Sequence, residues 1–183
     1  MQTVNVEIEG ISPILFNNFF DPSVLDKPGG KKKSMAQRAL DVDQKVYRKT
    51  NTGPIGIPSM NIKKCMLEGS QFSGMKIGKR GAVEYIRATM FFDTDFVSFG
   101  VKKPNGIHEC TGRIPPKTGA RVMIRRPYLN AGWKLAFNLL FMDERVSLEM
   151  GRDALTEGGL VRGLCDHRPE YGRFKINRFD IEA

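Results

Sequence analysis

The sequence predicts an α+β domain of the split βαβ, or ferredoxin-like (RRM-like), type. Three observations support this fold class: an alternating strand opens the chain, two capped helix patterns begin near residues 59 and 147, and an apolar strand precedes the second of them. With insertions set aside, the elements follow the order strand, helix, strand, strand, helix, strand. A chain of 183 residues has the length of one domain. We therefore expect a single ferredoxin-like domain over residues 1–183, with a basic arm inserted over residues 21–51.

The first half of the chain combines a strand with this basic insertion. Apolar and polar residues alternate over residues 4–9, as in a half-buried strand. Residues 21–33 have loop composition, and the apolar spacing from Met35 to Val46 predicts a short helix after them. Ser59 is then predicted to cap a helix over residues 60–69.

The middle of the chain has β-type composition. Strands are predicted over residues 87–92 and 96–101, around an acidic turn. Pro104-Asn105-Gly106 is a hairpin signal, and residues 121–126 form a short basic strand.

The last third supplies the remaining elements of the fold. Residues 134–142 are the strongest strand candidate, with four apolar side chains on one face. Ser147 is predicted to cap the following helix, and Gly158-Gly159 is predicted to end it. The closing strand covers residues 174–181, where the alternation is imperfect.

The charge of the chain indicates a polyanionic partner. The formal net charge is +9 and the pI is about 9.6, which favours nucleic acid or an anionic membrane surface. No apolar run reaches the roughly 18 residues of a spanning helix, and the N-terminus does not have the pattern of a signal peptide. The chain has three cysteines, and a number that is both small and odd does not suit a disulfide framework. We expect a cytoplasmic protein that binds nucleic acid and no membrane.

Lysines and arginines gather in glycine-rich loops. Glycine lets backbone N–H groups approach an anion together with the charged side chains, so such loops suit phosphate contact. A solvated surface remains the alternative interpretation for any single cluster.

The segment over residues 163–173 has the richest chemistry. Arg168 precedes Pro169 and is thereby biased to extended geometry. Tyr171 could stack on a base and Arg173 could hold a phosphate; the alternative is a structural turn in which Arg168 pairs with Asp166 or Glu170. The predicted nucleic-acid-binding residues are Lys31, Lys32, Lys33, Lys63, Lys64, Lys76, Lys79, Arg80, Arg126, His167, Arg168, Tyr171 and Arg173.

Two mirrored pairs, His108-x-Cys110 and Cys165-x-His167, raise the question of a metal. Residues two apart on a strand face the same side, so four such ligands could converge on zinc. The spacing is not the usual CxxC, and we assign no metal and no cofactor.

Catalytic motifs are not evident. The sequence contains no GxxxxGK[ST] loop, GxGxxG fingerprint or HExxH, and we assign no catalytic residue. Asp21 and Asp26 could position a metal or a ribose hydroxyl, although a turn aspartate is the simpler interpretation of each.

Several segments resemble the RAMP superfamily, the repeat-associated proteins of CRISPR effector complexes. Gly56–Lys63 (GIPSMNIK), which opens a helix, is similar to the family motif IPGSSLKG. Leu155–Leu160 leads into the glycine-rich loop Gly163–Gly172 and the strand Arg173–Ile176, which resembles the family's closing pattern. Arg126, followed by the strand from Trp133, is similar to the segment before the family's last helix.

The sequence departs from this pattern in two places. Ser59-Met60-Asn61 stands where glycine and serines are usual, and Cys165–Pro169 replaces a plain glycine run. The second departure resembles small uncharacterised phage proteins.

The resemblance implies a ferredoxin-like palm with an arm after an early strand, polymerising along single-stranded RNA with other effector subunits. Some members cut RNA with an early-loop aspartate or process it, which would draw attention to Asp21 or Asp26.

The functional hypothesis is therefore a sequence-independent protein that oligomerises, as a homo-oligomer or filament, along single-stranded RNA or DNA. Three alternatives stay open: a phage protein that binds single-stranded DNA, a metal- or histidine-dependent endoribonuclease, and an oligomeric structural protein whose charge is incidental.

Overall fold

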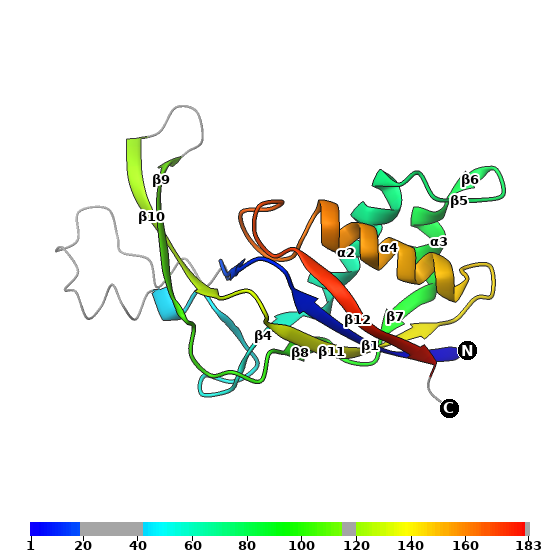
Figure 1. The fold of residues 1–183 in the computed structure, drawn as a ribbon, viewed down its shortest axis with the longest axis horizontal. Coiled ribbons are helices and arrows are strands. Elements are labelled where there is room, and N and C mark those ends of the chain that lie inside the picture. Colours follow the sequence, from blue (N-terminus) through cyan, green and yellow to red (C-terminus); the bar gives the residue numbers. More distant parts are fainter. Residues whose placement is uncertain (19–41, 115–119, 182–183) are drawn as a thin grey trace.

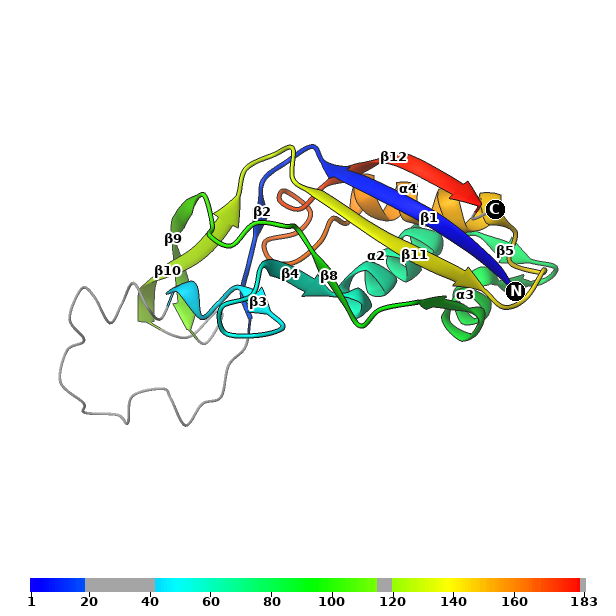
Figure 2. The same cartoon turned by 90° about the horizontal axis from the view of Figure 1, so that it is seen from below.

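The computed structural model describes residues 1–18, 42–114 and 120–181. Its central element is a four-stranded antiparallel sheet in the order β12-β1-β11-β7. Helices α2 and α4 lie together on one side of this sheet (Figures 1 and 2). This order and connectivity confirm the predicted ferredoxin-like palm. Its elements are β1 (Gln2–Gly10), α2 (Ser59–Phe72), β7 (Met90–Phe92), β11 (Lys134–Phe141), α4 (Leu148–Val161) and β12 (Phe174–Ile181).

The alternation in the sequence accounts for the core of the palm. Val6 pairs with Phe137 and Ile8 with Leu135 across β1 and β11, and all four side chains are buried. Their polar neighbours face the other side of the sheet. In β12 the alternation is imperfect because the register with β1 shifts at Asn177, where a bulge inserts one residue.

Helices α2 and α4 cross at two glycines. A Cβ atom on Gly158 would lie 2.6 Å from the backbone oxygen of Cys65, and a Cβ atom on Gly69 would collide with the backbone of Gly158. The predicted end of α4 at Gly158-Gly159 is therefore wrong, and the helix continues to Val161. These glycines permit close helix packing instead of ending the helix.

A second group of strands lies beyond the palm. The sheet β2-β10-β9 consists of Ile14–Leu15, Ala120–Leu129 and Gly106–Ile114, and the sheet β3-β4-β8 consists of Tyr47–Arg48, Ile55–Pro58 and Phe96–Ser98. The long hairpin β9–β10 projects away from the palm (Figure 1). A short hairpin, β5 (Lys76–Ile77) with β6 (Arg80–Gly81), precedes α3 (Ala82–Thr89).

Three predictions for the middle of the chain need correction. Residues 87–89 belong to α3, because Ala82 and Ile86 bury one helical face, and only residues 90–92 form a strand. The second predicted strand, over residues 96–101, ends at Ser98, before Gly100 with its positive φ. Pro104-Asn105-Gly106 is not a hairpin turn, since Gly106 begins β9, which pairs with β10 and not with β8.

The helix starts are predicted with mixed success. Ser147 caps α4 as expected, accepting a hydrogen bond from the Met150 amide at 3.1 Å. Ser59 does not cap α2: it is the first helical residue, and Pro58 occupies the cap position without a side-chain bond. The predicted helix from Met35 lies mostly outside the described residues, and it does not extend to Val46, which is buried just before β3.

None of the helices in the described part of the chain is long and apolar enough to cross a membrane.

The contact between α2 and α4 can be tested with a substitution at Gly158. Gly158→Val should destabilise the protein by about 1–3 kcal/mol, because the added atoms meet backbone that cannot move aside. Denaturant unfolding would measure the loss. Gly81→Ser is the control, since a Cβ atom at Gly81 meets nothing within 4 Å. Equal stability of the two variants would contradict the proposed role of the close approach.

Candidate nucleic-acid interface

Residues 163–173, here named the C-terminal loop, are fixed by backbone hydrogen bonds. The Leu164 amide donates to the Gly172 carbonyl at 2.9 Å, which closes the loop on itself. The Gly172 amide donates to Pro13 at 2.8 Å and the Asp166 amide to Leu15 at 3.1 Å. The loop is thereby attached to the segment that leads from β1 into the outer sheet.

The loop backbone adopts conformations that side chains rarely allow. Cys165 and His167 have φ angles of 63° and 55°, in the left-handed region. Such angles cost free energy in residues other than glycine, and they concentrate at functional sites. Gly172, with φ of 74°, packs so close to the Leu164 backbone that no side chain fits there. The surrounding bonds hold His167 in a conformation that the local sequence does not favour.

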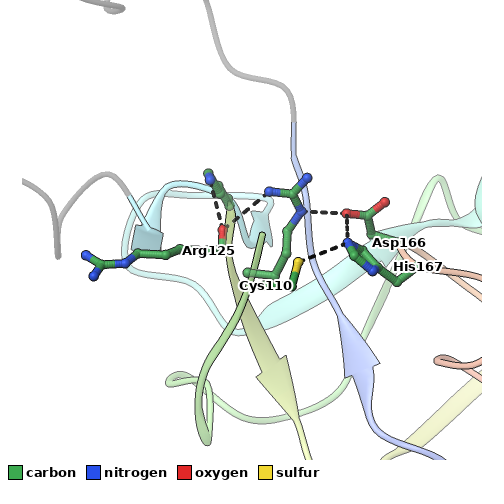
Figure 3. A network of polar contacts seen from close by, with 6 residues as sticks. Cys110, Arg125, Asp166 and His167 are labelled. Atoms are coloured by element: carbon green, nitrogen blue, oxygen red, sulfur yellow. Dashed lines mark hydrogen bonds and ion pairs between the residues drawn. The ribbon is translucent and has the colours of Figure 1, made fainter. Parts of the chain in front are cut away.

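A polar network joins the loop to hairpin β9–β10 (Figure 3). Nε of Arg126, on β10, lies 2.5 Å from Oδ2 of Asp166, and the Arg126 side chain is only 14% exposed. Cys110 Sγ and Asp166 Oδ2 each lie 4.0 Å from Nε2 of His167. Lys45 also donates a hydrogen bond from Nζ to the Arg125 carbonyl on β10, at 2.9 Å. The orientation of the hairpin is therefore set by the loop.

Three aromatic rings meet beside this network. The His108 ring lies 5.3 Å from the Tyr171 ring and 6.1 Å from the His167 ring, and His167 lies 6.3 Å from Tyr171, all between centroids. All three residues are partly exposed. The two histidines are the only ones in the chain, and the fold brings them together from β9 and the C-terminal loop. We call these three residues the aromatic cluster.

A groove of about 600 Å³ opens between α2, the end of α4 and the C-terminal loop. Within it, Nη1 of Arg168 donates to Oε2 of Glu68 at 3.1 Å, an ion pair of half-buried side chains. The guanidinium of Arg162 lies 6.0 Å from the centre of the exposed Phe72 ring. The residues that line this groove, named the α2 groove, are Glu68, Gln71, Arg162, Cys165, Asp166, His167, Arg168 and Pro169.

The thiols near the loop are not activated. Burial raises the pKa of Cys65 to about 12, and burial likewise raises the pKa of Cys165 well above its usual range. Both are therefore protonated thiols at neutral pH, which are poor nucleophiles and poor metal ligands. Among the described residues, no group of three or more His, Cys, Asp or Glu side chains is placed to hold a metal ion.

Four of the predicted arginine and aromatic residues come together at the loop. Arg126, His167, Arg168 and Tyr171 lie around the network, the aromatic cluster and the α2 groove. The alternative in which Arg168 pairs with Asp166 or Glu170 is wrong, because the carboxylate that pairs with Arg168 is that of Glu68 on α2. The side chain of Arg173 donates from Nε to the Pro169 carbonyl at 2.7 Å, within the loop itself.

The predicted lysines lie elsewhere. Lys76, Lys79 and Arg80 are exposed on hairpin β5–β6, away from the C-terminal loop in both views (Figures 1 and 2). Lys64 is exposed on α2, whereas Lys63 lies 4.6 Å over the Phe91 ring. Burial, and next the charge of Arg87, lower the pKa of Lys63. Lys31, Lys32, Lys33, Asp21 and Asp26 lie outside the described residues.

Sequence reasoning missed three side chains of this site. His108 and Cys110 were considered only as metal ligands, although their alternation on a strand indicates a shared face. Glu68 carries no local signal, since its role depends on a contact with Arg168 across one hundred residues.

The outer face of the palm sheet is an unsuitable surface for a polyanion. Glu7 and Glu9 point outward from its central strand, where they pair with Lys134 at 3.5 Å and Lys175 at 3.6 Å. Carboxylates in the middle of this face repel phosphates and neutralise the lysines beside them. The candidate interface is therefore the end of the palm at the C-terminal loop.

Comparison with known proteins gives a likeness of fold. No family model matches the chain, and no curated protein matches it. Among solved structures, the chain is similar to a chain in the cryo-EM structure of the Type III-B Cmr-beta bound to cognate target RNA, with a TM-score of 0.52 and 13% sequence identity. The match covers 98% of this chain and 60% of the other, so this chain spans about three fifths of that chain's length. At this identity the likeness concerns the fold alone, and it agrees with the ferredoxin-like palm described above.

Proposed function

We propose that this chain binds single-stranded RNA, with the C-terminal loop and hairpin β9–β10 forming the two sides of the interface. The observation that carries the proposal is the aromatic cluster, in which His108, His167 and Tyr171 meet beside Arg126. Unstacked bases bind to aromatic side chains and guanidinium planes, and neighbouring cations bind the phosphates. A single strand offers both groups at once, whereas a duplex hides its base faces.

The charge distribution supports contact with the backbone of the strand. Lys64, Lys76, Lys79 and Arg80 are exposed and make no ion pair with the described residues. The last three lie on hairpin β5–β6, away from the C-terminal loop, so they would contact a part of the strand that continues past the aromatic cluster. Arg126, Arg168 and Arg173 instead have partners within the fold, so they position the loop as well as adding charge. Phosphate contact alone does not depend on base identity, which favours largely sequence-independent binding.

The structural likeness favours RNA over DNA and favours an assembly. The chain that matches comes from a Type III-B Cmr-beta bound to its cognate target RNA. We propose by analogy that this chain is a RAMP-type subunit that lines up along RNA with further copies of itself or with other subunits. Binding of single-stranded DNA in a phage remains the rival assignment, and the following measurement separates the two.

The purified protein should carry RNA if the proposal holds. Preparation without nuclease should give a raised ratio of absorbance at 260 nm to that at 280 nm in a large species. RNase, and not DNase, should reduce its size. Affinity for labelled single-stranded RNA should fall with salt, with a log–log slope of about −0.7 for each phosphate neutralised. A monomer free of nucleic acid that also fails to bind oligonucleotides at low salt would overturn the proposal.

Tyr171 provides the sharpest test of the aromatic cluster. Tyr171→Ala should weaken RNA binding by about 1–3 kcal/mol, the usual contribution of one base stacked on an aromatic side chain. Tyr171→Phe keeps the ring and should bind like the unchanged protein. Fluorescence anisotropy gives the affinities, and thermal unfolding shows whether both variants are folded. Equal binding by the folded alanine variant would remove Tyr171 from the interface.

The aromatic cluster also favours a second candidate function, an endoribonuclease. The histidine rings lie 6.1 Å apart, and Asp166 lies 4.0 Å from Nε2 of His167. In this reaction one imidazole would take the proton of a ribose 2′-hydroxyl, whose oxygen attacks the adjacent phosphorus. The other would protonate the departing 5′-oxygen. The products would be a 2′,3′-cyclic phosphate and a free 5′-hydroxyl.

Cleavage by this route should require both histidines. His108→Ala and His167→Ala should each abolish cleavage of labelled RNA, and a 2′-deoxy sugar at the cut site should block it, because the attacking oxygen is then missing. Gel electrophoresis and mass spectrometry identify the termini. RNA that stays intact with the unchanged protein would exclude this candidate and leave the binding proposal standing.

A further inference from the structure

The α2 groove is a second concave surface beside the proposed interface, on the helix side of the C-terminal loop. Its volume of about 600 Å³ lies in the range of pockets that hold small ligands. It shares His167 and Asp166 with the network at hairpin β9–β10. A strand bound at the aromatic cluster would therefore pass the mouth of the groove, where a base could leave the strand and enter it.

The ion pair in the groove uses only part of its hydrogen-bonding capacity. Arg168 donates from Nη1 to Oε2 of Glu68, and neither its other guanidinium nitrogens nor Oε1 of Glu68 bonds to any described residue. A guanidinium has five N–H donors and a carboxylate has about four acceptor sites. The pair thus presents donors and acceptors side by side. The Arg168 side chain is 30% exposed and the Glu68 side chain is 27% exposed.

We propose that the α2 groove is a guanine-binding pocket, which rests on the proposed binding of single-stranded RNA. The Watson–Crick edge of guanine carries the acceptor O6 beside the donors N1–H and N2–H. Arg168 would donate to O6 while Glu68 accepts from N1–H and N2–H. Adenine and cytosine present a donor where guanine has O6, and they lack a donor in the place of guanine N1–H. Their Watson–Crick edges therefore do not match the groups that Arg168 and Glu68 present.

The rim of the groove provides a surface for the base to stack on. Arg162 lies over the Phe72 ring at 6.0 Å and has no ion pair within the described residues. Phe72 is 63% exposed, directly after Gln71 of the groove lining. A guanidinium held over an aromatic ring presents a flat cationic surface, on which bases stack. This arrangement favours a nucleobase over a free phosphate as the occupant.

The experiment compares oligocytidines that differ at one central residue. A single guanosine should raise affinity about tenfold over adenosine at the same position, as expected for one bidentate contact to a base edge. Inosine, which lacks the N2 amino group, should lie between the two. 7-Deazaguanosine keeps the whole Watson–Crick edge and should bind like guanosine. These ligands test the pocket with the protein unchanged.

A pair of variants assigns the effect to Glu68. Glu68→Gln should remove the preference for guanosine over adenosine at the central residue, because the neutral amide replaces one carboxylate acceptor by a donor. Glu84→Gln is the matched control, since Glu84 forms an exposed ion pair with Arg87 at 2.9 Å on α3. It should keep both the affinity and the preference. Thermal unfolding confirms that each variant is folded.

The outcomes separate this inference from the function on which it rests. Tight binding without a preference for guanosine, or a preference that survives in the folded Glu68→Gln variant, overturns the guanine pocket and leaves RNA binding intact. No binding to any of the oligonucleotides overturns the proposed function, and the pocket with it.

Discussion

The attachment of the C-terminal loop to residues 13–15 determines how the rest of the molecule is arranged. The Gly172 amide bonds to Pro13 and the Asp166 amide to Leu15, so the end of the palm and the start of the outer sheet share one rigid junction. Leu15 also belongs to β2, which pairs with β10. The same loop therefore fixes the hairpin twice, through β2 and through the Arg126–Asp166 ion pair. A surface that must hold a flexible strand gains from this rigidity, because less conformational entropy is lost on binding.

This junction explains why several arginines near the site are paired within the fold. A guanidinium that donates to Asp166 or Glu68 still has N–H groups left, and its position is fixed in advance. The lysines of hairpin β5–β6 are exposed and have no such partner among the described residues, so their side chains stay free to move. The two kinds of cation suit different tasks: fixed arginines can recognise a shape, whereas free lysines add affinity that depends on salt.

The sequence predicts the palm well and the site only in part. Alternation and the cap at Ser147 are local signals, so β1, β11, α4 and β12 could be placed from them. The glycines at 158–159 mislead, because a helix end and a close helix contact have the same local composition, and only the position of α2 distinguishes them. Of hairpin β9–β10, only strand β10 is predicted from the sequence, because the polar strand β9 has no apolar face. The contacts of Arg168 with Glu68 and of His108 with His167 join distant segments, and no local pattern encodes them.

Backbone binding and recognition of one base are compatible in a single site of this design. The proposed phosphate contacts are spread over hairpin β5–β6, α2 and the loop, and contacts of this kind would give similar affinity for any strand. The Glu68–Arg168 pair acts at one point, and a carboxylate near a polyanion costs free energy unless donors occupy it. Such a carboxylate is unexpected in a surface that only grips phosphates, where Arg168 alone would bind more strongly. Phosphate binding does not explain why this carboxylate lies beside the loop. A bound base with two adjacent donors would explain it.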